Sequence, residues 1–323
     1  MLAGLITARG CISLVETPEP VLPDQPGKIV FQPEITCLCG SDLPYFDEES
    51  GGYPRGLGHS LHEMIGTVVA TTGQRFRPGQ RVLAVPVNQV GLFERYVLGE
   101  ERAIPLDPRP VPEEAMLAQP LGTVIFALKK LGGLLDQTAV VVGQGPIGQM
   151  FNLCLRNLGA REIVVVDKVP TRLRRSAANG ATAVVDSSRE EPVAAVRRAL
   201  GGELADVVIE AVGHRDQALE LCVRLCRKAG RLLYFGVPPE HLERVGWREL
   251  FKQNLTVHTS VDPDFTRDFP LAMRWIAEGR VDVSRLITHR FELAQIQRAF
   301  EVFREREEGA LKVLVRFPAA NRP

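Results

Sequence analysis

The sequence carries no excess charge of either sign. Its 39 lysines and arginines balance 39 aspartates and glutamates, so the formal net charge at pH 7 is zero. Proteins that bind nucleic acid or other polyanions electrostatically usually present an excess of basic residues. No uninterrupted apolar segment approaches the ~20 residues of a membrane-spanning helix. We therefore predict no nucleic-acid partner and no insertion into a membrane.

Cysteine is also scarce, and the six cysteines among 323 residues show no repeated spacing. A secreted domain with a disulfide framework usually places its cysteines at regular intervals, so this pattern is typical of a reducing compartment. The apolar stretch within residues 1–9 is too short for a secretory signal. The expected location is the cytoplasm.

What the sequence does contain is a glycine-rich turn between two predicted strands. An apolar run at 140–142 is followed by G-Q-G-P-I-G at 143–148, a helix-length segment, and a second apolar run that ends at Asp167. Glycine lets the backbone leave a strand sharply and approach a pyrophosphate, and the free N–H groups at the start of the helix attract phosphate. This arrangement predicts a dinucleotide-binding βαβ unit.

Asp167 indicates which dinucleotide binds. It lies 19 residues after Gly148, where a carboxylate can accept hydrogen bonds from the ribose hydroxyls of the adenosine. The same carboxylate repels a 2′-phosphate, so NAD is favoured over NADP, although two nearby cations weaken this preference. The predicted cofactor-binding residues are Gly143, Gly145, Pro146, Ile147, Gly148, Asp167, Lys168 and Arg172.

The rest of the chain shows two different sequence patterns. Residues 1–118 contain short β-type runs separated by turn residues at intervals of about ten, which predicts a β-barrel or sandwich. From residue 119 helices alternate with apolar strands, and six such strands suit a doubly wound parallel sheet. We therefore predict an α/β protein with a dinucleotide-binding domain at 119–261. The second domain is expected to consist of residues 1–118 together with 262–323.

A second group of residues has the composition of a metal site. Cys39 and Ser41 follow a predicted strand, and His59 comes 20 residues after Cys39, shortly before His62 and Glu63. A converging thiolate, imidazole and carboxylate suit zinc, and a zinc site with an open position polarises an alcohol or carbonyl oxygen. Each residue alone is more often structural. The pairing of the two segments ahead of a dinucleotide fold supports the zinc interpretation.

Taken in order, these segments resemble the medium-chain dehydrogenase/reductases of the zinc-type alcohol dehydrogenase superfamily. The resemblance covers nearly the whole chain, and it implies a GroES-like catalytic domain, a Rossmann domain and an active site in the cleft between them. The matching segments are C-G-S-D at 39–42, H-E-M-I-G-T-V at 62–68, P-G-Q-R-V at 78–82, G-L-F-E-R-Y-V at 91–97, the glycine-rich unit ending at Asp167, and D-V-V-I-E-A-V-G at 206–213.

The resemblance implies roles for individual residues. Cys39 matches the first zinc ligand, and Ser41 matches the hydroxyl that hydrogen-bonds the substrate oxygen and starts proton transfer. The histidine ligand is ambiguous, because the segment looks like the family motif with three extra residues. Spacing from the preceding glycine favours His59, which we prefer, and spacing to the following glycine favours His62 with Glu63. The expected catalytic residues are therefore Ser41, Cys39 and His59.

Three departures from the family pattern bear on the chemistry. The third zinc-ligand position, normally Cys, Glu or Asp, is Gln119, whose neutral amide binds zinc weakly. Either Glu63 or His62 then substitutes as a ligand, or the metal is loose or absent. Pro44 replaces the relay histidine, which leaves Tyr45 or water to carry the proton. The lobe with four cysteines for a structural zinc is missing, so at most one zinc, at the catalytic position, is expected.

Two charged residues have a structural and a functional interpretation. Lys312 matches a basic residue that recurs near the end of such chains, and an ion pair that stabilises the fold is its simplest role. Glu210 ends a predicted strand and either contacts the cofactor or binds a neighbouring turn.

These observations lead to one main hypothesis and two alternatives. The main one is an oxidoreductase that transfers hydride between NAD(H) and a secondary alcohol, polyol or sugar-like hydroxyl, or the corresponding ketone, with assistance from zinc. The first alternative is a zinc-free reductase of an activated C=C bond or a quinone. The second is a dinucleotide-binding protein without turnover. The expected partner is a small-molecule substrate, and the resemblance implies a homodimer or homotetramer.

Overall fold

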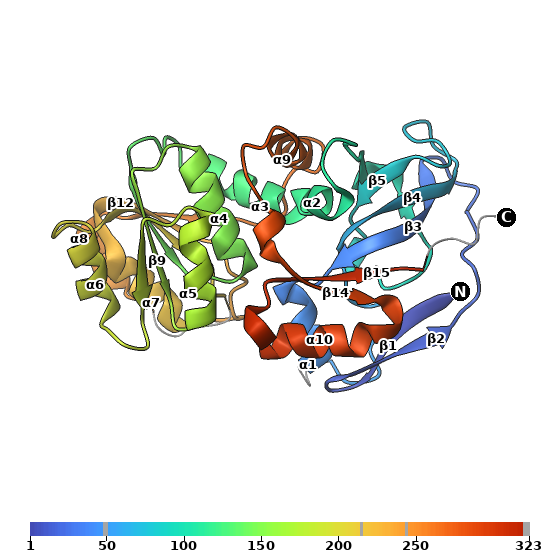
Figure 1. The fold of residues 1–323 in the computed structure, drawn as a ribbon, viewed down its shortest axis with the longest axis horizontal. Coiled ribbons are helices and arrows are strands. Elements are labelled where there is room, and N and C mark those ends of the chain that lie inside the picture. Colours follow the sequence, from blue (N-terminus) through green and yellow to red (C-terminus); the bar gives the residue numbers. More distant parts are fainter. Residues whose placement is uncertain (48–50, 214–215, 243–244, 319–323) are drawn as a thin grey trace. The chain divides into compact units, whose positions relative to one another are not determined.

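The computed structural model describes residues 1–47, 51–213, 216–242 and 245–318, and Figure 1 shows the course of the chain. The chain divides into two compact units, which we describe one at a time. Unit 1 consists of Met1–Gln119, Phe265–Ala277 and Leu286–Pro323, and unit 2 of Pro120–Asp264 and Glu278–Arg285. The first division falls beside the predicted boundary at 118/119, and unit 2 additionally takes a short segment from the C-terminal part of the chain.

Unit 2 contains a parallel sheet of six strands, which lie in the order β10-β9-β8-β11-β12-β13. This is the order of a doubly wound dinucleotide-binding fold, and the winding direction reverses between β8 and β11. The central strands are rich in valine and buried, because helices cover both faces of the sheet. The strands are β8 (Thr138–Val142), β9 (Glu162–Asp167), β10 (Ala183–Asp186), β11 (Ala205–Glu210), β12 (Cys226–Tyr234) and β13 (Thr256–Thr259).

The helices that connect two strands of the unit 2 sheet pack on that sheet. In Figure 1, α4 and α5 lie along one side of the sheet, and α6 and α7 along the other. Apolar side chains from α6, α7 and α8 and from the strands form a continuous buried core. The helices are α3 (Ala118–Lys129), α4 (Pro146–Asn157), α5 (Pro170–Ser176), α6 (Pro192–Ala199), α7 (Asp216–Leu225) and α8 (Trp247–Gln253).

Unit 1 contains a mixed sheet in the order β14-β15-β3-β4-β5-β7, a strand β6 that pairs with β3, and a separate hairpin of β1 and β2. Only β14 and β15 run parallel among these pairs. The strands are β1 (Leu2–Ala8), β2 (Cys11–Glu16), β3 (Lys28–Cys37), β4 (Glu63–Thr71), β5 (Arg81–Ala84), β6 (Tyr96–Gly99), β7 (Ala103–Pro105), β14 (Ile287–Glu292) and β15 (Lys312–Arg316).

Strand β3 organises unit 1, because three strands from distant parts of the sequence pair with it. Cys37, the last residue of β3, lies opposite Glu63 of β4 and opposite Leu314 of β15. The start of β4 and the start of β15 therefore meet at the end of β3, two residues before Cys39.

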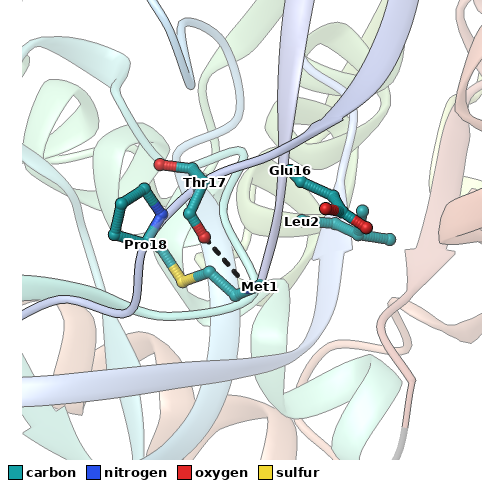
Figure 2. A pocket seen from close by; sticks show the side chains of 5 residues that line it. All are labelled: Met1, Leu2, Glu16, Thr17 and Pro18. Atoms are coloured by element: carbon teal, nitrogen blue, oxygen red, sulfur yellow. Dashed lines mark hydrogen bonds between the residues drawn. The ribbon is translucent and has the colours of Figure 1, made fainter.

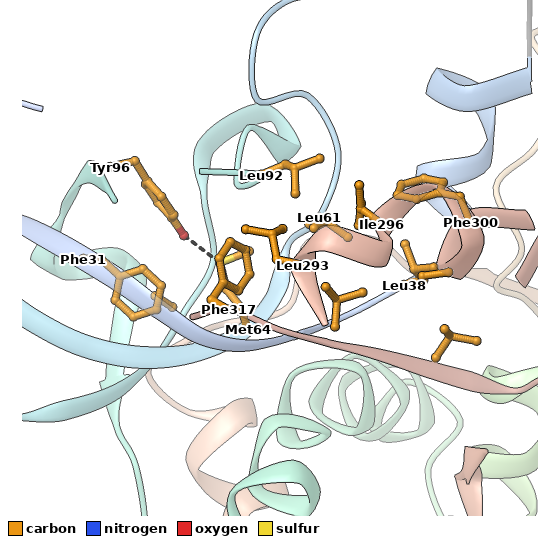
Figure 3. Packing of buried hydrophobic residues seen from close by; sticks show 14 of the residues in the cluster. Phe31, Leu38, Leu61, Met64, Leu92, Tyr96, Leu293, Ile296, Phe300 and Phe317 are labelled. Atoms are coloured by element: carbon orange, nitrogen blue, oxygen red, sulfur yellow. Dashed lines mark hydrogen bonds between the residues drawn. The ribbon is translucent and has the colours of Figure 1, made fainter. Parts of the chain in front are cut away.

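The helices of unit 1 cover its sheet and complete its core. Figure 3 shows Phe300 and Ile296 of α10 in the same apolar cluster as Leu38 and Leu61. The last two side chains are fully buried and precede Cys39 and His62 in the sequence. The core therefore anchors both loops that carry candidate site residues. The helices are α1 (Leu43–Asp47), α2 (Pro112–Met116), α9 (Asp268–Ala277) and α10 (Ile296–Glu305), and a short 3-10 helix, η1 (Gly40–Asp42), precedes α1.

A surface pocket of about 520 Å³ lies where β1 begins and β2 ends. Figure 2 shows its lining, and the amino group of Met1 donates a hydrogen bond to the carbonyl oxygen of Thr17 at 3.0 Å. Because none of the predicted site residues lines this pocket, it is not the candidate site. Within the described residues, the helices are all too short or too polar to cross a membrane.

Candidate catalytic and cofactor-binding sites

In unit 1, Cys39, His62 and Glu63 lie close enough together to bind one metal ion. Their ligand atoms all lie within 4.8 Å of one another. The antiparallel pairing of β3 and β4 explains this proximity, because the residue after β3 and the first residues of β4 approach each other at one end of the pair. We call Cys39, His62 and Glu63 the Cys39 cluster.

The buried carboxylate of Asp42 joins the two loops that carry the cluster. Its Oδ2 accepts a hydrogen bond from the Cys39 backbone N–H at 2.7 Å. Its Oδ1 accepts from the hydroxyl of Ser60 and from the backbone N–H of Leu61, both at 2.8 Å. Ser60 and Leu61 have φ angles of 94° and 68°, which are strained for residues with a side chain. Asp42 therefore holds the strained segment in place directly before His62.

Glu63 forms a buried ion pair with Lys312, the first residue of β15. The Lys312 Nζ lies 2.7 Å from Oε1 and 2.5 Å from Oε2, and both side chains are 1% exposed. Burial raises the pKa of Glu63, and the charge of Lys312 opposes this effect. Burial has the largest effect on Lys312 and disfavours its cation, but Glu63, Cys37 and Cys39 together outweigh burial and keep the pKa of Lys312 above its usual value. The ion pair expected for Lys312 is thus present, with Glu63 as its partner.

His59, the histidine preferred from sequence spacing, lies outside the Cys39 cluster. Its ring packs edge-on against Tyr45 with the centroids 5.1 Å apart, and its Nδ1 is buried without a hydrogen-bond partner. Ser41 is partly exposed in η1, between Cys39 and Asp42, and Gln119 is buried near the start of α3. The structure therefore brings His62 and Glu63, rather than His59, next to Cys39.

The Cys39 cluster has the donor types that zinc prefers. It offers sulfur, nitrogen and oxygen donors, and catalytic zinc sites use three such protein ligands and keep one position open. The Nδ1 of His62 is buried without a hydrogen-bond partner, and its nearest carboxylate oxygen, Asp42 Oδ1, is 3.9 Å away. A buried ring nitrogen of this kind is available to a metal. The residues present therefore fit a zinc ion.

In unit 2, the glycine-rich turn follows β8 and leads into α4. Gly143 leaves the strand with a φ of 96°, which favours glycine. A Cβ on Gly148 would lie 1.8 Å from the carbonyl oxygen of Gly143, so the turn closes only with glycine there. A Cβ on Gly145 would meet no atom nearer than the Arg172 Nη1 at 3.7 Å. The space over Gly145 is open to a phosphate, with a guanidinium nearby.

Asp167 lies at the end of β9 and is tied to this turn. Its Oδ2 accepts a hydrogen bond from the Gln144 backbone N–H at 2.5 Å, and its Oδ1 accepts from the Val169 backbone N–H at 2.8 Å. Arg172 is partly buried in α5, and Lys168 is exposed. Asp167, Arg172 and the glycine turn therefore lie together at the carboxyl ends of β8 and β9.

A buried network of hydrogen bonds between uncharged side chains stabilises the turn. The Gln144 Oε1 accepts hydrogen bonds from the Asn152 Nδ2 at 2.8 Å and from the Ser176 hydroxyl at 2.9 Å. All three side chains are fully buried. Sequence reasoning missed this network and the role of Asp42. In both cases, polar residues within an otherwise apolar, turn-forming segment were the available signal.

Comparison with known proteins gives a family match and two curated relatives that bear on these sites. Residues 146–278 match the family described as zinc-binding dehydrogenase. Human sorbitol dehydrogenase is 26% identical over 331 residues, which cover 88% of this chain and 88% of the relative. L-threonine 3-dehydrogenase from Bacillus subtilis (strain 168) is 23% identical over 339 residues, which cover 95% and 96%.

A solved structure extends the likeness to the whole fold. A short chain alcohol dehydrogenase from Escherichia coli CFT073, complexed with NADH, has a TM-score of 0.85 and 21% identity, and the match covers 98% of this chain and 99% of that chain. These matches span both units, and the GroES-like and Rossmann folds expected from the sequence are confirmed. These likenesses support the resemblance to the medium-chain dehydrogenase/reductase superfamily, and the chain is an oxidoreductase of the alcohol and polyol dehydrogenase type.

Proposed function

We propose that the protein is an NAD(H)-dependent dehydrogenase of a secondary alcohol, a polyol or a sugar-like hydroxyl, and that it also reduces the corresponding ketone. The main support is that one chain combines a glycine turn suited to a pyrophosphate with the Cys39 cluster, which is suited to polarising an oxygen atom. The small-molecule substrate supplies or accepts the hydride.

The preference for NAD rests on Asp167. Both of its oxygens accept backbone N–H groups, so an acceptor stands at the end of β9, where the adenosine ribose hydroxyls donate hydrogen bonds in this fold. A 2′-phosphate at the same position would meet a negative charge. Arg172 and Lys168 reduce this discrimination, because their positive charges favour phosphate.

The reaction requires one path for a hydride and another for a proton. NAD, when bound, would accept the hydride that leaves the substrate carbon, while the proton of the substrate hydroxyl leaves toward water. Ser41 is partly exposed beside Cys39, and its hydroxyl is proposed to hydrogen-bond the substrate oxygen and to accept this proton while it donates its own proton onward. Pro44 has no group that titrates, so Tyr45 or water carries the proton onward.

Zinc, when bound, supplies a Lewis acid that lowers the pKa of the substrate hydroxyl. Cys39, His62 and Glu63 are the residues that would hold it. Asp42 keeps the two ligand-bearing loops together, and Lys312 balances the charge of Glu63.

The test combines metal content with turnover. Wild-type protein, a Cys39→Ser variant and a Cys11→Ser control are purified, and their zinc is measured by mass spectrometry. Cys11 is exposed and is not among the cluster residues. We expect about one zinc per chain in the wild type and in the control, and far less in Cys39→Ser. Formation of NADH is then measured with a panel of secondary alcohols, polyols and sugars.

Two outcomes contradict this proposal. NAD binding without turnover on any member of the panel leads to the non-catalytic interpretation. Metal-free protein that reduces an activated C=C bond or a quinone leads to the zinc-free interpretation. The latter has one specific support, because Lys312 already binds both oxygens of Glu63.

We also propose a homodimer or homotetramer that assembles through β13. Among the described strands, β13 pairs only with β12, and its Val257 is 44% exposed. A second copy offers the same open edge, so antiparallel pairing of two β13 strands closes both edges at once. A Val257→Lys substitution should give a monomer by light scattering, whereas Val184→Lys, on the opposite edge strand β10, should not. An assembly unchanged by Val257→Lys excludes this interface.

A further inference from the structure

Glu210, the last residue of β11, is a buried carboxylate for which the proposed reaction has no use. Its side chain is fully buried. Its Oε1 accepts hydrogen bonds from the backbone N–H groups of Val212 and Gly213, both at 2.8 Å, and its Oε2 accepts from the backbone N–H of Gly236 at 3.1 Å. One side chain thus holds the loop that follows β11 and the loop that follows β12.

The two loops touch through their backbones. A Cβ on Gly236 would lie 2.2 Å from the Gly213 nitrogen and 2.6 Å from the Glu210 Oε2. The carbonyl oxygen of Glu210 also accepts a hydrogen bond from the Phe235 backbone N–H at 3.1 Å. The contact therefore depends on the absence of a side chain at Gly236 and on the carboxylate that binds both loops.

The position of these loops in the sheet indicates what they face. A dinucleotide lies across the carboxyl ends of the strands where the winding reverses, which is between β8 and β11 in this protein. Asp167 at the end of β9 marks the adenosine side. The loops after β11 and β12 are on the opposite side of the reversal, and each presents an exposed apolar side chain, Val212 at 42% and Val237 at 55%.

We infer that Glu210 is a positioning residue for the nicotinamide half of the cofactor. Its carboxylate holds the loops after β11 and β12 in one fixed arrangement. The exposed valines of these loops then pack against the nicotinamide ring. This role rests on the proposed binding of NAD(H). Glu210 itself touches only the protein and takes no part in the transfer of hydride.

The adenosine half has its own support, which provides a matched control. Gln144, Asn152 and Ser176 form a separate buried network under the glycine turn, on the β8 and β9 side of the reversal. Damage to this network acts on the half of the dinucleotide that NADH shares with ADP-ribose. Damage at Glu210 acts on the half that only NADH has.

The experiment measures dissociation constants for NADH and ADP-ribose by calorimetry in the wild type and in Glu210→Ala, Gly236→Ala and Ser176→Ala. We expect Glu210→Ala and Gly236→Ala to weaken NADH at least about tenfold, because buried N–H groups lose their acceptor or the loops are forced apart. ADP-ribose binding should be nearly unchanged in both. Ser176→Ala should weaken both ligands by the same factor.

The outcomes separate failure of the inference from failure of the proposed function. If Glu210→Ala weakens NADH and ADP-ribose equally, or weakens neither, the assignment of Glu210 to the nicotinamide half is wrong. If the wild type binds neither ligand, the proposed function is wrong. Retained ADP-ribose binding shows that a variant is folded, and Gly236→Ala provides the answer if Glu210→Ala does not fold.

Discussion

The cofactor turn of unit 2 and the Cys39 cluster of unit 1 are stabilised in different ways. Gln144 meets Asn152 and Ser176 through hydrogen bonds between uncharged groups, across 8 and 32 positions of the sequence. Glu63 meets Lys312 through a buried ion pair that spans 249 positions. A buried uncharged group that loses its hydrogen-bond partner costs about 1–3 kcal/mol, whereas a buried charge that loses its partner costs about 3–5 kcal/mol. The two sites should therefore respond differently to substitution.

The largest effect on stability is expected at the buried ion pair of the Cys39 cluster. Replacing Lys312 with Met leaves Glu63 buried without a cation, and we expect the free energy of unfolding to fall by roughly 3–5 kcal/mol. The double variant Glu63→Gln with Lys312→Met removes both charges and should recover most of this loss. Urea unfolding measures both variants. A double variant as unstable as Lys312→Met shows that packing, rather than charge, holds this position.

A smaller effect is expected at Asp42, where charge serves to join loops. Asp42→Asn keeps the shape of the side chain but replaces one of its two acceptor oxygens by an NH2 group, so at least one of the three donors loses its acceptor; this should cost about 1–3 kcal/mol of stability. Because the same bonds hold the loops before and after the ligands, zinc content should also fall. NADH binding should stay unchanged, since unit 2 is not altered. Zinc retained at the wild-type level contradicts the role given to Asp42.

In the cofactor turn, substitutions at two glycines should distinguish an effect on stability from an effect on NADH binding. Gly148→Ala places a Cβ against the carbonyl of Gly143 and should cost about 1–3 kcal/mol, with loss of NADH binding. Gly145→Ala has room for its Cβ and an ordinary φ of −67°, so the melting temperature should stay the same. NADH should still bind more weakly to Gly145→Ala, because the methyl group occupies the approach of the phosphate. Unchanged affinity in Gly145→Ala excludes this approach.

The smallest effect concerns an ion pair near the surface of unit 1. Hydrogen bonds from Arg290 hold the pKa of Glu113 below its ordinary value of 4.5, and Arg316 adds to this effect. A lowered folded-state pKa means that the stabilisation is present above about pH 4.5 and is lost as the pH falls through the folded value. Since both arginines are 48% exposed, Glu113→Gln should cost about 1 kcal/mol or less at pH 7.

The pH series provides the control for this last variant. The difference between Glu113→Gln and the wild type should disappear in acid, where the wild-type carboxyl is also neutral. A difference that persists at pH 2–3 means that Glu113 stabilises the protein through packing instead.

The sequence predicted the cofactor turn better than the Cys39 cluster, for a physical reason. The turn, α4 and Asp167 are close in sequence, and the spacing of the glycines follows from the strand–turn–helix geometry itself. In the cluster, the three extra residues before Glu63 leave the choice between His59 and His62 open to spacing arguments. Strand pairing between β3 and β4 decides which histidine approaches Cys39, and pairing register is a tertiary property.

Interaction partners that are far apart in the sequence were the second feature that could not be predicted. Nothing near Glu63 in the sequence indicates that its cation is Lys312, and the resemblance suggested only that this lysine forms some ion pair. The link between Asp42 and Ser60 was likewise invisible, because it depends on the strained backbone of a loop. Sequence patterns therefore predicted which types of residue form the site. Strand pairing in unit 1 determines which individual residues lie close together.

The pairing of β15 with β3 has a consequence for synthesis on the ribosome. Translation has to continue 249 residues beyond Glu63 before the lysine that neutralises it emerges. All of unit 2 is synthesised in this interval, so a nascent chain can complete unit 2 before the final strand of unit 1 has been made. Chaperones that bind unfinished chains should therefore stay longest on the segment around Glu63.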